Sequence, residues 1–255
     1  MNPIFEIARM TFADAIRNKI FYGAFAFLII LFFTAAALAS VTMGRTELMI
    51  SDLGLGAVSI LGNLMAVIIT IQSLQQERES RALYVLITRL QQRWKYLAGK
   101  LIGLSAVLGL QVIFMCAILA LCIAFFGQIY WQSFFQACIA TIFEIWIVIA
   151  VALLFSQTSS LFLAILLTLS VDIAGRFTFT IRQLGEQSDN PALQLITQAM
   201  YYLLPNLESV NLRNQAGYIP SYEWSEFIQI LSYSCSEIFL IFALCCIIFN
   251  RKNLA

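Results

Sequence analysis

Three carboxylates, Glu144, Asp172 and Glu237, lie inside long apolar runs of the sequence. If these runs cross a membrane, each ionised carboxylate costs about 3 kcal/mol at the centre of the hydrocarbon and must face protein or water. Buried side chains of this kind line paths for polar solutes or carry protons. We therefore take Glu144, Asp172 and Glu237 as candidate translocation-path residues.

Each of these carboxylates also has a purely structural interpretation. Asp172 and Arg176 are four residues apart, so they can form an ion pair on one helix face. Glu144 lies near the middle of its run and can bind a neighbouring helix while protonated. Glu237 follows three nearby serines, a polar patch that indicates the interfacial start of the last span.

Several residue types needed for catalysis are missing. The chain has no histidine, which removes the commonest general base and the commonest metal ligand. Its six cysteines lie in or beside apolar runs without CxxC spacing, so we expect packing residues rather than metal ligands. There is no GxSxG motif and no second intramembrane aspartate beside Asp172. These absences argue against an enzyme and predict no metal site.

The composition requires a lipid environment. Of the 255 residues, 61% are hydrophobic and 11% are charged, whereas a soluble domain has about 25% charged residues. The mean hydropathy is +0.85. This composition excludes a cytosolic enzyme, a nucleic-acid-binding domain and a secreted disulfide scaffold.

Six apolar runs are candidates for membrane spans, since about 20 residues cross about 30 Å of hydrocarbon. We therefore predict an all-α integral membrane protein with six transmembrane helices in a single domain, residues 1–255. The fifth run is short, and a re-entrant fifth segment would move everything after it to the other side. The runs are Ile20–Val41, Leu53–Leu74, Leu101–Phe126, Phe134–Phe155, Leu161–Gly175 and Phe227–Phe249.

The first run is preceded by an amphipathic segment, residues 3–19, which predicts a helix lying in the membrane interface. Its expected apolar face consists of Ile4, Phe5, Ala8, Phe12, Ala15 and Ile16. With the N-terminus inside, four of the 15 basic residues fall outside, namely Arg45, Arg176, Arg182 and Arg213. The excess of basic residues inside predicts that both termini face the cytoplasm, in a multi-pass protein of the inner (cytoplasmic) membrane.

Two segments between the runs are long enough to carry a function. The cytoplasmic one, residues 75–100, contains a helical apolar stripe and is either a docking surface for a soluble partner or a basic loop lying on lipid. The outer one, residues 176–226, contains a predicted amphipathic helix between Pro191 and Pro205. That helix is either an external gate or an anchor packed on the bundle. Its expected polar face is Gln194, Thr197, Gln198 and Tyr201.

The cytoplasmic segment resembles the permease subunits of type-2 ABC exporters, as do the amphipathic first helix and the six-span layout. The matching residues are Glu77, Glu79, Arg81, Leu86, Thr88, Arg89, Arg93, Trp94, Tyr96, Gly99 and Lys100. Residues 203–208 and 211–213 resemble the branch that contains the permease of the nitrous-oxide-reductase copper-centre maturation system. One departure is Leu90, which replaces the proline that usually follows the Thr-Arg pair.

The resemblance implies that residues 77–90 form a coupling helix seated in a cleft of a separate ABC ATP-binding subunit. The implied coupling residues are Glu77, Arg78, Glu79, Arg81, Leu83, Leu86, Thr88, Arg89 and Arg93. Six spans are half of an export pore, which implies a second permease copy in a homodimer or a related heterodimer. A periplasmic protein is a further candidate partner, the lipid bilayer surrounds the chain, and no nucleic acid is expected.

The chain itself lacks a phosphate-binding loop. Gly99-Lys100 is followed by Leu101, and Trp94 stands where the first glycine is required. ATP and Mg²⁺ would therefore bind to the partner, and this chain carries no cofactor of its own. We expect a non-catalytic permease subunit of an ATP-driven exporter. The alternative is a scaffold that transmits ATP-driven motion to a partner without moving a substrate.

Overall fold

The computed structural model describes residues 3–17, 25–31, 33–34, 46–79, 93–127, 129–188, 191–213, 216 and 218–251. All of the longer regular elements in these ranges are helices, so the predicted all-helical fold class is confirmed for them. The elements are α1 (Pro3–Arg17), α3 (Thr46–Glu79), α5 (Arg93–Phe126), α6 (Trp131–Thr158), α7 (Leu161–Arg176), α8 (Thr178–Glu186), α9 (Pro191–Leu203), the 3₁₀ helix η1 (Glu208–Val210) and α10 (Trp224–Arg251).

Four helices, α3, α5, α6 and α10, are long and apolar enough to cross a membrane, as expected of a multi-pass membrane protein. A fifth crossing is possible if α7 and α8 together form one span, although the pair is bent by 57°. Each of the four long helices contains one predicted run and extends beyond it. The first predicted run, Ile20–Val41, lies mostly outside the described residues. Within this run the structure describes residues 25–31 and 33–34, and these are helical.

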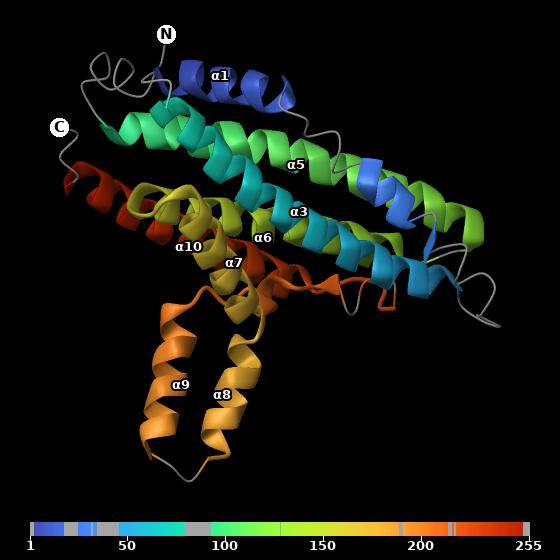
Figure 1. Cartoon of the computed structure of the whole chain (residues 1–255). Coiled ribbons are helices and arrows are strands. Elements are labelled where there is room, and N and C mark those ends of the chain that lie inside the picture. Colours follow the sequence, from blue (N-terminus) through green and yellow to red (C-terminus); the bar gives the residue numbers. More distant parts are fainter. Residues whose placement is uncertain are drawn as a thin grey trace.

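Helix α6 lies at the centre of the bundle and packs against α3, α5, α7 and α10 (Figure 1). Residues 147–153 of α6 are buried on all sides of the helix, and Ile147, Ile149 and Leu153 are essentially inaccessible to solvent. A helix that is apolar around its whole circumference is typical of such a central position. The buried polar residues of α6, among them Gln136 and Glu144, are consequently enclosed by protein.

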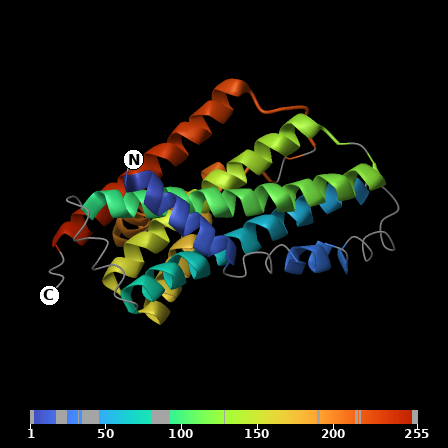
Figure 2. The same ribbon diagram turned by 90° about the horizontal axis from the view of Figure 1, so that it is seen from above.

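Helix α1 packs across the first half of α5, as the view from above shows (Figure 2). Glycines at positions 99 and 103 of α5 permit this approach, because a Cβ at Gly103 would lie 2.8 Å from the carbonyl oxygen of Ala8. The buried side of α1 includes Ile7 and Ala8, whereas Phe5 is 68% exposed. The predicted helix is therefore present, and Ala8 of its expected apolar face packs against α5, while the exposed Phe5 accords with a position at the membrane interface.

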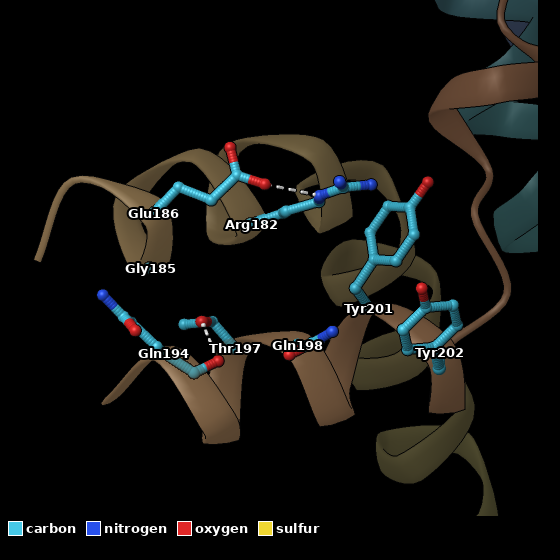
Figure 3. Close-up of a pocket in the computed structure, with 8 residues that line it drawn as sticks. All are labelled: Arg182, Gly185, Glu186, Gln194, Thr197, Gln198, Tyr201 and Tyr202. Carbon is cyan, nitrogen blue, oxygen red and sulfur yellow. Dashed lines mark hydrogen bonds and ion pairs between the residues drawn. The ribbon is translucent and has the colours of Figure 1, made fainter. Parts of the chain in front are cut away.

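Helices α8 and α9 form an antiparallel hairpin that projects away from the long helices (Figure 1). Helix α9 runs from Pro191 to Leu203, as the two prolines predict. Its polar face points toward α8 and lines a cavity of about 280 Å³ (Figure 3). The lining residues are Arg182, Gly185, Glu186, Gln194, Thr197, Gln198, Tyr201 and Tyr202.

The outer surface of this hairpin is largely apolar. Leu195 is 70% exposed, and Ile196 and Phe179 are also exposed. Within the hairpin, Arg182 lies over the ring of Tyr201 at 4.9 Å and pairs with Glu186 at 2.8 Å. The polar side chains thus gather on the facing sides of the two helices, although Arg182 and Glu186 stay exposed, and the exposed apolar residues form a surface that suits a lipid or protein environment.

Candidate functional site

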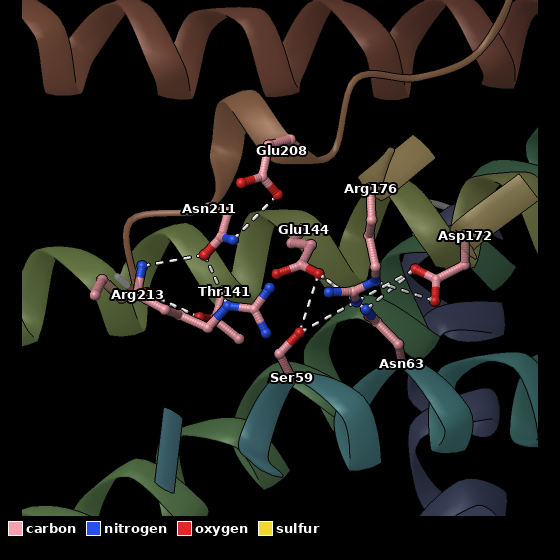
Figure 4. A network of polar contacts seen from close by, with 10 residues as sticks. Ser59, Asn63, Thr141, Glu144, Asp172, Arg176, Glu208, Asn211 and Arg213 are labelled. Atoms are coloured by element: carbon pink, nitrogen blue, oxygen red, sulfur yellow. Dashed lines mark hydrogen bonds and ion pairs between the residues drawn. The ribbon is translucent and has the colours of Figure 1, made fainter. Parts of the chain in front are cut away.

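A buried polar cluster forms around Glu144, near the middle of α6 (Figure 4). One carboxylate oxygen, Oε1, accepts hydrogen bonds from Ser59 Oγ at 3.0 Å, Asn63 Nδ2 at 3.0 Å and Arg176 Nη2 at 2.6 Å. The Glu144 side chain is only 2% exposed. Helices α3, α6 and α7 therefore meet at a single carboxylate.

Asp172 joins the same cluster from α7. Its Oδ1 accepts a hydrogen bond from Asn63 Nδ2 at 3.3 Å and lies 3.4 Å from Arg176 Nη2. The ion pair predicted from the four-residue spacing of Asp172 and Arg176 is therefore confirmed. Arg176 lies closer to Glu144, however, at 2.6 Å, and the sequence did not predict that partner.

The local sequence explains how each side chain reaches the cluster. Ser59 and Asn63 are four residues apart on α3, and so are Asp172 and Arg176 on α7, which places each pair on one helix face. Helix α7 then ends at a bend, and the chain returns to this bend after α9. There Leu207 N donates to the carbonyl of Gly175 at 3.2 Å. This backbone contact holds Arg176 beside Glu144.

A second cation, Arg213, lies on the other side of Glu144 (Figure 4). Its Nε donates to Asn211 Oδ1 at 2.8 Å, and Asn211 Nδ2 donates to Glu208 at 3.2 Å. Burial lowers the pKa of Arg213, and the negative charge of Glu144 opposes that shift. With two carboxylates and two guanidinium groups, the centre of the cluster is formally neutral, which reduces the cost of burying it.

Sequence reasoning missed Ser59, Asn63 and Arg213. The available signal was weak, because small polar residues spaced by four inside the run Leu53–Leu74 are common in packed membrane helices. Asn63 Oδ1 has no hydrogen-bond partner among the described residues, although the residue is buried.

Glu237 does not join the cluster. It accepts a hydrogen bond from Tyr233 Oη at 2.9 Å, one turn earlier on the same helix, and Tyr233 Oη accepts from Asn206 N at 3.0 Å. Helix α10 begins at Trp224, so Glu237 lies near its middle. The helix begins well before the serines, and the serine hydroxyls bond to carbonyls of the same helix. An interfacial position for this polar patch stays a prediction. A role for Glu237 in a path stays a prediction.

The predicted coupling residues are only partly described. Arg81, Leu83, Leu86, Thr88 and Arg89 lie outside the described residues, and Arg93 begins α5. Glu77, Arg78 and Glu79 occupy the last turn of α3.

Two of these three side chains bind within the bundle. Glu77 pairs with Lys100 at 2.5 Å and accepts a hydrogen bond from Tyr96. Arg78 donates to Gln157 Oε1 at 2.9 Å.

In the described part of the chain, no three His, Cys, Asp or Glu side chains are grouped to hold a metal ion. Among curated proteins, none matches the chain. The family model described as ABC-2 family transporter protein matches residues 5–254. Because this match covers nearly the whole sequence, the chain belongs to the ABC-2 family of transporter proteins.

Proposed function

We propose that this chain is the membrane-spanning permease subunit of an ATP-driven ABC exporter. Family membership supports a permease that works with an ABC ATP-binding subunit. The observation that carries the transport role is the buried Glu144–Arg176 pair at the junction of α3, α6 and α7. Buried charges in membrane bundles are costly, and they mark solute paths and moving elements.

In this proposal, ATP and Mg²⁺ bind to the partner subunit, and residues 77–90 couple its closure to the permease. The arrangement of the described helices supports such a role. The C-terminal end of α3 and the N-terminal end of α5, which flank the coupling residues, lie at the same end of the bundle as the C-terminal ends of α6 and α10. Motion applied at this end would reach four long helices directly.

The remaining features of the proposal follow the sequence. The chain forms one domain with six transmembrane helices, keeps both termini in the cytoplasm and lies in the inner membrane. Two permease copies enclose the path, with Glu144 and Asp172 beside it and the hairpin of α8 and α9 as an external gate. Membership in the nitrous-oxide-reductase maturation branch, which rests on residues 203–208 and 211–213, and a periplasmic partner belong to the same proposal.

The alternative is a mechanotransmission subunit, in which ATP hydrolysis changes a bound partner and no substrate crosses. The same ion-paired cluster would serve this alternative by holding three helices together as a rigid unit. Purification with the ATP-binding subunit, followed by reconstitution into lipid vesicles, tests both. ATP-dependent movement of a compound across the vesicle membrane supports the exporter. ATP turnover that changes only a bound partner supports the alternative.

A further inference from the structure

Glu77, Tyr96 and Lys100 join α3 to α5 at the end of the bundle where α3 ends and α5 begins. Glu77, in the last turn of α3, accepts a hydrogen bond from Tyr96 Oη and lies 2.5 Å from Lys100 Nζ. Tyr96 and Lys100 are four residues apart on α5 and share one face. The contact therefore joins two helices through a single carboxylate.

The burial of these partners is unusual for a surface charge pair. Lys100 is 1% exposed and Tyr96 is fully buried, whereas the Glu77 side chain is 22% exposed. Lysine is almost never fully buried unless its ammonium group is paired. Glu77 is therefore the group that makes a buried lysine tolerable at this end of α5.

The same end of α3 is tied to the other long helices. The ring of Tyr96 stacks on Phe249 of α10 with centroids 6.1 Å apart, and Arg78 donates to Gln157 of α6. On another side of α5, Gly99 permits close packing of α1, because a Cβ there would lie 2.8 Å from Ile7 Cβ. Relative movement of α3 and α5 at this end would disturb all of these contacts.

The position of the contact in the chain gives it a functional meaning. Glu77 lies just before residues 80–92, and Tyr96 and Lys100 lie just after them. Helix α3 also carries Ser59 and Asn63, which bind Glu144. Asn63 and Glu77 are 14 residues apart on one helix, or about 21 Å at the rise of an α-helix.

We propose that Glu77, Tyr96 and Lys100 form a clamp at the base of segment 80–92. The clamp makes α3 and α5 respond together to force on that segment, and α3 carries the displacement to the Glu144 cluster. Glu77 is then a positioning residue rather than a contact of the ATP-binding subunit. This inference rests on the proposed function, because it requires a motor that acts on residues 80–92.

The test uses the complex of this chain with its co-purifying ATP-binding subunit. Spin labels are attached at Met49 on α3 and Trp224 on α10, both exposed, after replacement of the six native cysteines. Electron–electron double resonance measures the distance between the labels before and after trapping with ATP and orthovanadate. Glu77→Gln removes the clamp charge, and Glu6→Gln is the matched control, because Glu6 is exposed on α1 and lies outside both the clamp and the coupling segment.

We expect the wild type and Glu6→Gln to show a trapping-dependent change in distance. Glu77→Gln should lose this change while it retains the ATP-binding subunit and vanadate trapping. The double exchange of Glu77→Lys with Lys100→Glu restores the pair and should recover the change, which keeps the test valid if Glu77→Gln folds poorly.

Three outcomes would overturn the clamp: an undiminished change in Glu77→Gln, a folded double exchange that lacks the change, or loss of the ATP-binding subunit on Glu77→Gln. The last outcome would show that Glu77 contributes to binding of the ATP-binding subunit. A wild-type complex that neither holds an ATP-binding subunit nor traps vanadate would instead refute the proposed function.

Discussion

Arg176 Nη2 lies 2.6 Å from Glu144 Oε1, although the two residues are 32 positions apart and belong to different helices. Arg176 is the last residue of α7, directly before the bend into α8. The pair therefore connects the central helix to the point where the chain leaves the bundle.

Glu144→Gln should lower ATP-dependent transport by about tenfold or more and leave assembly with the ATP-binding subunit intact. The amide oxygen can still accept the hydrogen bond from Ser59, but Arg176 loses its closest charge partner. A tenfold change in transport rate corresponds to a change in activation free energy of only about 1.4 kcal/mol. Transport into reconstituted vesicles and co-purification measure the two effects separately. Glu6→Gln, at an exposed position on α1, provides the same substitution outside the candidate path. Unchanged transport in Glu144→Gln would remove Glu144 from the pathway.

Arg176→Met should destabilise the folded permease by about 3–5 kcal/mol, because it leaves two buried carboxylates with one cation fewer. Thermal unfolding in detergent should show a clear drop in Tm. Combining it with Asp172→Asn should recover part of the loss, since one unpaired charge is removed. Arg182→Met, which breaks an exposed pair on α8, is the control and should have little effect. Equal losses in the two single variants would contradict the cluster.

Reversal of Arg81 and Arg89 to Glu should abolish co-purification with the ATP-binding subunit and leave membrane insertion unchanged. Charge complementarity controls the encounter and orientation of partners, so reversed charges oppose docking. Affinity purification from membranes measures the complex, and membrane fractionation measures insertion. Arg182→Glu in the outer segment is the matched reversal. A complex that survived the double reversal would place the docking site elsewhere.

Gly103→Val should displace α1 from α5 and cost about 1–3 kcal/mol. The introduced Cβ would lie 2.8 Å from the carbonyl oxygen of Ala8, a backbone atom that cannot rotate away. Hydrogen–deuterium exchange of residues 3–17 should increase. Gly56→Val on α3 is the control, because no described atom of a neighbouring element lies within 4 Å of the point that its Cβ would occupy. Equal exchange in the two variants would show that the close approach of α1 is not required.

Much of the helical architecture could be predicted, because it depends on local chemistry. Long apolar runs satisfy their backbone hydrogen bonds internally only as helices in lipid, and this predicts α3, α5, α6 and α10. Pro191 and Pro205 predict the limits of α9 because proline begins helices and interrupts them. The Asp172–Arg176 pair follows from helical spacing alone.

Long-range partners could not be predicted in the same way. In a soluble helix the apolar stripe indicates the buried face, but in lipid every face is apolar, and the sequence alone does not indicate how a helix is rotated. The rotations of α3, α6 and α7 bring Ser59 and Arg176 to Glu144. The packing of α3 on α5 likewise pairs Glu77 with Lys100, although the sequence had suggested that Glu77 faces a partner.

For this chain, composition and spacing alone determined a multi-pass helical protein with a basic segment beside its second long apolar run. Only the tertiary structure decided which polar side chains meet, because that depends on helix rotation and on the return of the chain after α9 to the bend at Arg176. Tertiary packing also turned the polar face of α9 toward α8.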